Sequence, residues 1–518
     1  MLEFTLTHDK KYIEVTNYDD DELLRFKKGF KKMDKSYFAK KHFMDGTWDG
    51  YESFLEGNRM VASGLWYEVH KFCMRENIPV NIKGLGAIRN AFPFDGEEEA
   101  EFDKFVVKLL DGTGISPRPY QIDAAKQVLR HKYANAELAT ASGKTLTLFI
   151  VASWLKWKGI ISPANKLLII TSRVQLLTQI QNEFNEEYAN GYMPINLIIV
   201  GGKKNPFKQK LYDGCDVCVI SYQSTVSRTP DFYRCIAGVA VDEAHTAKGK
   251  SIPNVMLSCD ELVVRFGVSG TIKVDEKYST YFKIQQYLGP MVSRYSAHQL
   301  ISDGFAPEVK IKAVMLNYRN VLTPDIQNFR GLLKDGKDMY DDPVAFGKEM
   351  YSIETRLIRE NAERLRFIGK LVSKFDGNTL ILFNDVKTEY GTRIFEMFKD
   401  MGRHCHYIDG GVSVDNRTDY TEMMERRDDM VLVASYGTYS TGVNLKNVKY
   451  IVLAESFKAE ILIRQTIGRG MRPLKGKNVI YLVDIVDTFG KYSKEHFRER
   501  IQIYKRNKFE LKRYEVVL

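Results

Sequence analysis

The sequence predicts the α/β class, with two tandem domains that each hold a parallel sheet covered by helices, behind a small α+β domain. Short apolar runs alternate with helix-length segments along two successive parts of the chain, and this alternation is typical of parallel sheets. A chain of 518 residues also exceeds what one hydrophobic core usually organises. We therefore expect domains at residues 1–112, 113–309 and 310–518.

The first series of strands is expected between residues 114 and 308. It comprises the short run at 136–140, KLLIITS at 166–172, CDVCVISY at 215–222, AGVAVD at 237–242 and VRFGVSGT at 264–271. AGVAVD is apolar up to its final aspartate, which indicates a parallel strand that is buried on both faces.

A second, similar series begins after about residue 309. It comprises NTLILFND at 378–385, CHYIDG at 405–410, MVLVASY at 430–436, VKYIVLAES at 448–456 and NVIYLVDIVD at 478–487. The polar segment 319–350 is expected to join or decorate the two domains. The last thirty residues have a near-helical apolar spacing and predict a closing helix packed on the second domain, carried by Tyr492, Phe497, Ile501 and Tyr504.

Charge and composition favour a soluble protein with a polyanionic partner. The formal net charge is +10 and the pI is near 8.9, which is compatible with nucleic acid without proving it. No run approaches about eighteen apolar residues and the N-terminus lacks the apolar core of a signal peptide, so we expect a cytoplasmic protein that does not enter a membrane. The six cysteines fit free thiols, and the single CxxC at 215–218 predicts neither zinc nor redox chemistry.

The N-terminal domain contains a basic stretch, RFKKGFKKMDKSYFAKKHF, at residues 25–43. Eight Lys or Arg side chains face a single acid there and alternate with aromatic rings. Such interleaving can place cations on phosphates and rings on bases. The candidate nucleic-acid contacts are Lys27, Lys28, Lys31, Lys32, Lys40 and Lys41. The alternative is an amphipathic helix with buried rings and a solvated basic face.

ATASGKT, residues 139–145, predicts a phosphate-binding loop. Its small residues would let backbone N–H groups wrap a triphosphate, at Thr140, Ala141, Ser142 and Gly143. Lys144 would lie against the β and γ phosphates, and Thr145, at the start of the next helix, would hold Mg²⁺ through its hydroxyl. Leu138 stands where such loops usually have their first glycine, so this match is weak by itself.

DEAH at residues 242–245 follows a predicted buried strand, at the sheet edge where open α/β sheets bind ligands. Asp242 is the expected partner of Mg²⁺, and Glu243 the carboxylate that orients and deprotonates the attacking water. His245 is expected at the same nucleotide site. The alternative is a solvated acidic turn, which the phosphate loop upstream disfavours.

QTIGRGMR at residues 465–472 supplies Arg469 and Arg472, three positions apart and expected on one face at a helix start. As arginine fingers they would neutralise charge on the γ phosphate, so the site would be complete only when the two domains close. The alternative for this pair is a surface salt bridge. Gln465 and Gly442 are expected to bind the nucleotide too, and Ser269 and Thr271 of SGT to couple its state to domain closure.

Other motifs predict contacts to adenine and to a nucleic-acid strand. PRPYQ at 117–121 places Tyr120 and Gln121 upstream of the phosphate loop, where the Gln121 amide could read the adenine edge. Polar side chains that follow strands in both domains are candidates for phosphate contacts. These are Arg173, Gln223, Asn384 and Thr441. Each could equally belong to an ordinary turn.

Together PRPYQ, ATASGKT, DEAH, SGT and QTIGRGMR, in this order across residues 115–487, resemble the superfamily 2 helicases and translocases. The resemblance implies two RecA-like domains, hydrolysis of ATP with Mg²⁺, and movement along a nucleic-acid strand, usually 3′ to 5′. Residues 46–73, DEAHTAKGKSI and ASYGTYSTGVNLKNV resemble the recombination helicases of T-even bacteriophages.

This second resemblance implies a DNA helicase that acts in recombination, replication and repair in the host bacterial cytoplasm. Branch migration, fork regression and the unwinding of D-loops or R-loops are the implied activities. The implied partners are branched or junction DNA, RNA–DNA hybrids, and recombination or single-strand-binding proteins, with a monomeric chain. An RNA helicase and the motor subunit of a restriction or defence complex remain alternatives.

Overall fold

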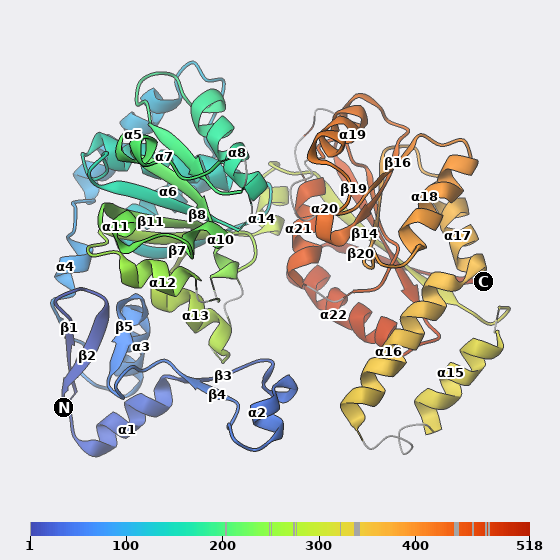
Figure 1. The fold of residues 1–518 in the computed structure, drawn as a ribbon, viewed down its shortest axis with the longest axis horizontal. Coiled ribbons are helices and arrows are strands. Elements are labelled where there is room, and N and C mark those ends of the chain that lie inside the picture. The colour runs from blue at the N-terminus through green and yellow to red at the C-terminus, as the bar shows by residue number, and fades with distance from the viewer. Residues whose placement is uncertain are drawn as a thin grey trace. The chain divides into compact units, whose positions relative to one another are not determined.

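The computed structural model describes residues 2–172, 174–202, 205–247, 249, 251–272, 275, 277–321, 323–335, 342–439, 445–457, 460–471, 474 and 477–518 (Figure 1). The chain forms two compact units, Met1–Tyr295 and Ser296–Leu518. Each unit contains one seven-stranded parallel sheet, and the first also carries a small mixed sheet at its N-terminus. The predicted pair of RecA-like domains behind a small α+β domain is therefore confirmed. No helix in the described ranges has the length and apolar character needed to cross a membrane.

The N-terminal domain is built on a four-stranded sheet in the order β5 (Met60–Ala62), β2 (Tyr12–Asn17), β1 (Glu3–Leu6) and β6 (Ile82–Lys83). Buried and partly exposed residues alternate along β1 and the first half of β2, because one face of the sheet meets the core. Helices α1 (Asp20–Gly29) and α3 (Trp66–Arg75) supply the other side of that core, and Phe26 and Phe72 pack edge to face with ring centroids 5.2 Å apart.

The basic stretch at residues 25–43 does not form one amphipathic helix. It contains the end of α1, the strand β3 (Lys31–Met33), a 3₁₀ turn (Tyr37–Ala39) and the start of the short helix α2 (Lys41–Met44). β3 pairs with β4 (Tyr51–Ser53) as a hairpin, and α2 lies in the connection between them (Figure 1). The predicted alternative of a single helix is therefore wrong.

The first parallel sheet has the strand order β13–β7–β12–β11–β8–β10–β9. Its strands are β7 (Tyr133–Leu138), β8 (Lys166–Thr171), β9 (Leu197–Val200), β10 (Val217–Ser221), β11 (Ile236–Asp242), β12 (Val264–Ser269) and β13 (Met291–Tyr295). Helices lie on both faces, with α5 (Gly96–Leu110) and α7 (Lys144–Trp157) above the sheet in Figure 1, and α12 (Ser251–Ser258) and α13 (Ser279–Leu288) below it. Five of these strands were predicted, whereas β9 and β13 were not.

The N-terminal domain shares a hydrophobic core with the first parallel sheet, so the two pack as one body. The closest approach is at Gly64, where an added Cβ would lie 2.4 Å from the carbonyl oxygen of Gln285 and 2.5 Å from that of Gln286. Beside it, the buried guanidinium of Arg265 donates to the hydroxyl of Ser63 at 2.8 Å. Glycine is the residue that permits this contact between the small domain and α13.

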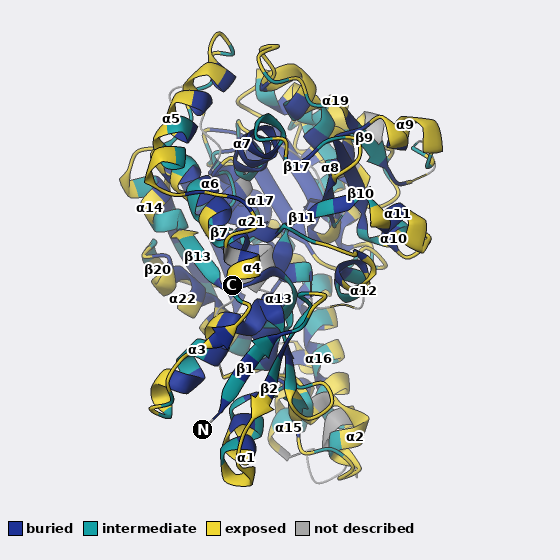
Figure 2. Ribbon diagram, turned by 90° about the vertical axis from the view of Figure 1, so that its left-hand side faces the viewer, coloured by how far each residue is buried: buried dark blue, intermediate teal, exposed yellow. Residues whose placement is uncertain are grey.

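The second parallel sheet has the order β16–β17–β15–β18–β19–β14–β20. Its strands are β14 (Glu308–Asn317), β15 (Thr379–Phe383), β16 (Cys405–Ile408), β17 (Val431–Ser435), β18 (Tyr450–Leu453), β19 (Val479–Asp487) and β20 (Glu510–Val517). Figure 2 shows that the buried residues concentrate on the strands, including β17 here and β11 in the first sheet. β14 and β20 were not predicted.

The polar segment 319–350, for which the sequence predicted no secondary structure, is largely helical. Residues 319–350 contain α15 (Pro324–Asp335) and the start of α16 (Pro343–Glu360), which contact each other as a pair. The predicted C-terminal helix is α22 (Tyr492–Arg506), and Phe497, Ile501 and Tyr504 are buried on it. The chain does not finish with this helix, because β20 follows and adds a further strand to the sheet.

A buried ion pair joins elements of this unit that are distant in sequence. On α17 (Ala362–Val372), the Nε of Arg364 lies 2.6 Å from Oδ1 of Asp487 at the end of β19, and neither side chain reaches solvent. Arg364 also donates to the carbonyl of Ala454 at 2.8 Å, and the hydroxyl of Tyr318 donates to Asp487 at 2.5 Å. Because these bonds satisfy both charges, burial of the pair is tolerated.

Candidate nucleotide site

The phosphate loop lies at the carboxyl edge of the first parallel sheet, between the end of β7 at Leu138 and the start of α7 at Lys144. Ala141 and Gly143 both have left-handed backbones, with φ of 68° and 75°. Left-handed residues interspersed in a loop turn successive N–H groups toward one side, which is the backbone arrangement that binds anions. Leu138, which replaces the usual first glycine, is the last residue of β7 and is fully buried in the core.

Tyr120 and Gln121 support the phosphate loop through hydrogen bonds to its backbone. Both lie at the start of α6 (Pro119–His131), and their side chains donate to the carbonyl of Ser142, each at 2.7 Å. The Gln121 carbonyl oxygen accepts the N–H of Arg118 at 2.8 Å, so both ends of its amide are used within the protein. An adenine contact by Gln121 stays a prediction, whereas its support of the phosphate loop is a contact that sequence reasoning missed.

The acidic residues of DEAH lie at the carboxyl end of β11, as predicted. Asp242 ends the strand, and Glu243 has a left-handed backbone, with φ of 53°, that lets its N–H donate to the Asp242 carboxylate at 2.9 Å. The Nζ of Lys144 lies 3.7 Å from Oε1 of Glu243. The structure therefore brings together the lysine of the phosphate loop and the two acids of the neighbouring motif.

The two carboxylates have opposite pKa shifts. Burial, together with the adjacent charge of Glu243, raises the pKa of Asp242 to about 7. Burial also acts to raise the pKa of Glu243, but the opposing effects of Lys144, His245 and Ser269 are larger and hold it below its usual range. Glu243 is consequently the ionised member of the pair near neutral pH, which is the state that a general base requires.

Ser269 and Thr271 contact the DEAH residues through a buried hydrogen-bond network. The hydroxyl of Ser269 donates to Oε2 of Glu243 at 3.1 Å. Nδ1 of His245 lies 2.8 Å from the Ser269 hydroxyl and 2.9 Å from that of Thr271. It also lies 3.2 Å from Oε2 of Glu243. Adjacent parallel pairing of β11 and β12 places these residues together.

The glycine between those hydroxyls packs against the phosphate loop. A Cβ on Gly270 would lie 2.9 Å from the backbone nitrogen of Thr140 and 3.2 Å from the carbonyl oxygen of Leu138. The SGT segment therefore touches the DEAH residues through its hydroxyls and the phosphate loop through its glycine.

Oxygen donors suited to Mg²⁺ flank the phosphate loop. Thr145 lies in the first turn of α7 and is partly exposed, and Asp242 ends the neighbouring strand. Hydroxyl, carboxylate and phosphate oxygens are the ligands that Mg²⁺ takes in nucleotide sites. Asp242 is partly exposed, and a divalent cation would stabilise the charged form of this carboxylate, whose pKa is raised by desolvation and by Glu243. This donor set fits the predicted metal.

The motif at residues 465–472 is only partly described. Gln465 is partly exposed on α21 (Glu460–Gly470). Arg469 lies in the last turn of that helix and not at a helix start, so this detail of the prediction is wrong. The remaining predicted residues that fall outside the described ranges are Arg173, Thr441, Gly442 and Arg472.

The predicted nucleic-acid contacts have varied surroundings. Gln223 is exposed on the short helix α10 (Tyr222–Thr225), and Asn384 is exposed directly after β15. In the basic stretch, Lys28 and Lys41 are exposed and Lys27 partly so.

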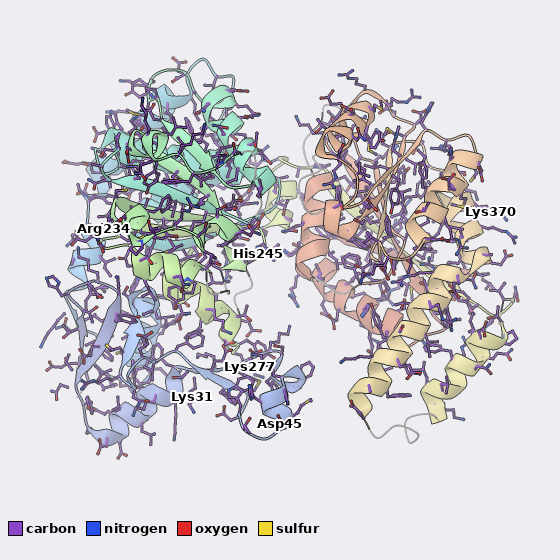
Figure 3. The ribbon with its side chains drawn as sticks, in the orientation of Figure 1. Lys31, Asp45, Arg234, His245, Lys277 and Lys370 are labelled. Atoms are coloured by element: carbon purple, nitrogen blue, oxygen red, sulfur yellow. The ribbon has the colours of Figure 1, made fainter. Side chains whose placement is uncertain are left out.

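The other three predicted lysines of the basic stretch make contacts within the protein. Lys40 pairs with Asp34 at 2.6 Å, and Lys31 lies 3.7 Å from Asp49. Lys32 lies 4.4 Å from the ring centroid of Phe282 on α13. Figure 3 labels Lys31 in the small domain and His245 at the nucleotide site.

Glu455 holds the segment that contains Asn384, a predicted nucleic-acid contact, and the sequence analysis did not identify this role. It follows β18 and accepts the backbone N–H of Asn384 at 2.7 Å, while Arg359 donates to it at 2.7 Å. It therefore fixes the FND segment at the carboxyl edge of the second sheet. An acid close to the end of an apolar run was a usable signal, because Asp242 was found by the same pattern.

Comparisons with known proteins agree with this geometry. A family model described as the res subunit of type III restriction enzymes matches residues 114–274, and one described as the helicase conserved C-terminal domain matches residues 363–473. The ATP-dependent DNA helicase UvsW of Enterobacteria phage T4 is 27% identical over 497 residues, which cover 90% of each chain. The type I restriction enzyme EcoAI endonuclease subunit of Escherichia coli is 23% identical and covers 70% of this chain and 45% of its own.

Among solved structures, the ATP-dependent type ISP restriction-modification enzyme LlaBIII bound to DNA has a TM-score of 0.57 with this chain. It is 16% identical, and the match covers 78% of this chain and 32% of that one. At this identity the likeness concerns the fold.

Proposed function

Because this chain belongs to the superfamily 2 helicases and resembles phage T4 UvsW, we propose that it is a DNA motor acting on branched substrates. As a helicase it depends on ATP. The proposed activities are branch migration, fork regression and the unwinding of D-loops or R-loops, in phage recombination, replication and repair, with 3′ to 5′ movement. The proposed partners are DNA junctions, RNA–DNA hybrids and recombination or single-strand-binding proteins, for a monomeric chain.

The observation that carries the ATPase part is the contact of Lys144 with Glu243, in a network completed by His245 and Ser269. Lys144 would bind the β and γ phosphates, and its departure toward them would leave Glu243 free to orient a water and accept its proton. Bound Mg²⁺, held by Thr145 and Asp242, would offset the charge that develops on the phosphates.

The remaining site residues have proposed roles as well. Thr140, Ala141, Ser142 and Gly143 would cradle the phosphates with backbone N–H groups. Ser269 and Thr271 would couple the state of the nucleotide to domain closure, since their hydroxyls contact the DEAH residues. Arg469 and Arg472 would neutralise charge on the γ phosphate, and Gln465 and Gly442 would contact the nucleotide.

Support for a DNA substrate comes from charge and from the N-terminal domain. The net charge of +10 favours a polyanion. The small domain packs on the ATP-binding sheet through a shared core, so a nucleic acid bound by one would be held in a fixed position relative to the other. UvsW is named as a DNA helicase, and it matches this chain over the small domain too, since the match covers 90% of both.

The test is the steady-state ATPase rate without nucleic acid and with single-stranded, duplex, forked and Holliday-junction DNA, RNA and an RNA–DNA hybrid. Strongest stimulation by branched DNA is expected, together with its loss in Lys144→Ala. Strongest stimulation by RNA would identify an RNA helicase instead. Displacement of an oligonucleotide placed on one or the other side of a single-stranded loading site measures the polarity.

A motor subunit of a restriction complex is a second candidate, favoured by the match to the EcoAI subunit. Such a subunit would leave cleavage and site recognition to partner chains. Stimulation by linear duplex alone, or only after a nuclease or specificity subunit is added, would support it. Activity of the isolated chain on forks would exclude it.

A further inference from the structure

A pocket of about 680 Å³ opens on the N-terminal domain, beside the β3–β4 hairpin and α2. Its lining combines the aromatic side chains of Trp48 and Tyr51 with the polar and charged side chains of Lys40, Glu52, Lys283 and Gln286. A concave site that combines rings with a few polar groups is the usual form of a small-molecule or base-binding pocket. The pocket is far larger than one water molecule requires and can admit a planar ring.

We propose that this pocket holds an unpaired base of a DNA strand, stacked on Tyr51; the proposal rests on the DNA substrate proposed above. Single-stranded DNA is bound by aromatic rings on which bases stack, next to cations that track the phosphates. The Tyr51 side chain is 41% exposed although its strand is paired. A large ring left in solvent on an ordered hairpin is therefore available for a flat partner.

Trp48 and Lys40 fix the wall beside Tyr51. The indole Nε1 of Trp48 donates to the carbonyl of Tyr51 at 2.7 Å, which sets the orientation of the indole relative to the strand. The ammonium of Lys40 lies 5.0 Å from the centroid of the Trp48 ring, a cation–π contact. Because these side chains are already held in place, a base that enters orders few additional groups.

The frame of the pocket is held by Asp34. Its carboxylate accepts the ammonium of Lys40 at 2.6 Å and both the N–H and the hydroxyl of Ser36 at 2.7 Å. Its own N–H donates to the carbonyl of Gly50 at 2.9 Å, which joins the two sides of the excursion between β3 and β4. The pocket is thus part of an ordered structure and not of a loop end.

Charge favours a nucleic-acid occupant over an apolar peptide. Lys41 is exposed between the lining residues Lys40 and His42, where it can reach a phosphate backbone. Lys283 enters from α13 and pairs with Glu52 at 2.6 Å, and the ionised pair offers both donors and acceptors to a base edge.

Residues of α13 connect the pocket to the motor. Lys283 and Gln286 belong to α13, and Phe282 of the same helix packs on Phe54 with centroids 5.2 Å apart. The pocket therefore moves as one body with the sheet that carries Lys144 and Glu243. A base held here would be fixed relative to the nucleotide site while the strand is pulled.

The test measures binding of fluorescently labelled oligo-dT and of a fork with single-stranded arms to the full chain. Tyr51→Ala should weaken both by about 10-fold, in line with the loss of one base stack, and Tyr51→Phe should retain the parent affinity. The matched control is Tyr67→Ala. Tyr67 is 40% exposed on the same domain and has Lys71 4.9 Å from its ring centroid, but it does not line this pocket.

Abasic oligonucleotides separate base stacking from charge. An oligonucleotide of the same length without bases keeps its phosphates, so it should bind the parent more weakly than oligo-dT does. That difference should shrink in Tyr51→Ala and persist in Tyr67→Ala. Equal oligo-dT affinity of the parent and Tyr51→Ala, or an equal loss in Tyr67→Ala, would overturn the pocket assignment while DNA binding itself stands. Absence of DNA binding by the parent would instead overturn the proposed function, and the pocket assignment with it.

Discussion

Removal of the Ser269 hydroxyl is expected to slow ATP hydrolysis and to move its pH dependence. This hydroxyl donates to Oε2 of Glu243 at 3.1 Å and lies 2.8 Å from Nδ1 of His245. Burial acts to raise the pKa of Glu243, and the donors and cations around the carboxylate reverse that effect. Ser269→Ala takes away one donor and leaves Lys144 and Thr271 in place.

The size of the effect follows from the charge of the acceptor. A hydrogen bond to an ionised group is worth about 1.5–3 kcal/mol, and about 1.4 kcal/mol corresponds to one pKa unit. The pKa of Glu243 should therefore rise, because the remaining donors and cations stabilise its charged form less. Because a general base must be deprotonated, activity would then be lost at a higher pH as the solution is acidified. At neutral pH, kcat should fall about 10- to 100-fold, since the carboxylate is also less well oriented.

The assay is kcat at saturating ATP and DNA across the acidic to mildly alkaline range. Ser153→Ala is the matched control, because the Ser153 hydroxyl is also buried but has no hydrogen-bond partner within the described part of the chain. The control should keep both the rate and the pH profile. An unchanged kcat with an unmoved acidic limb in Ser269→Ala would show that Ser269 does not act on the Glu243 carboxylate.

Two further perturbations follow from the site and from the fold. Asp242→Asn should abolish hydrolysis yet stabilise the nucleotide-free chain above pH 7 by roughly 1–3 kcal/mol, because burial raises the pKa of Asp242 to about 7 and its charged form is costly there. The gain should decrease as pH falls below about 7 and vanish only near the ordinary aspartate pKa of about 3.9, where the carboxyl is protonated in the unfolded chain too. Calorimetry at several pH values measures the gain, and an equal gain at every pH would contradict the cause. Gly64→Ala should cost about 1–3 kcal/mol of stability, since its Cβ would meet two carbonyl oxygens of α13 at 2.4 and 2.5 Å. Gly96→Ala, whose Cβ meets nothing within 4 Å, is the control, and equal thermal midpoints for the two variants would refute the close contact.

The strands that sequence reasoning found are those with a continuous apolar run. β11 and β17 are buried at nearly every position, so their residues alone indicate a strand between two helical layers. β20 is different, because most of ELKRYEVV is exposed and only its pairing with β14 makes it a strand. The alternative of a single helix over the basic stretch was wrong for a related reason, since β3 pairs with β4 and the N–H of Asp34 donates to the carbonyl of Gly50 across this hairpin.

The candidate site was predictable wherever a motif sets its own local structure. Asp242 and Glu243 lie at the end of β11, Lys144 follows the loop after β7, and the parallel sheet brings these two strand ends to one edge. The contacts of Gln121 with the carbonyl of Ser142, and of Glu455 with the N–H of Asn384, join segments that are far apart in sequence. No local sequence pattern specifies which backbone group Gln121 or Glu455 will contact. The sequence alone shows only that each is a polar residue beside a turn or a strand.

The pairing of β14 with β20 bears on how the chain is made. Asn317 lies opposite Val517, so the two partners are 200 positions apart, although both belong to one edge of one sheet. At a translation rate of about 5–20 residues per second, β14 waits roughly 10–40 seconds for its outer neighbour to be synthesised. Its inner neighbour β19 is also made late, since Leu316 lies opposite Asp487, so β14 presents unpaired N–H and C=O groups, the kind of edge that recruits foreign strands, throughout that interval. Nascent chains stalled before residue 510 should therefore depend on chaperones more than the completed protein does.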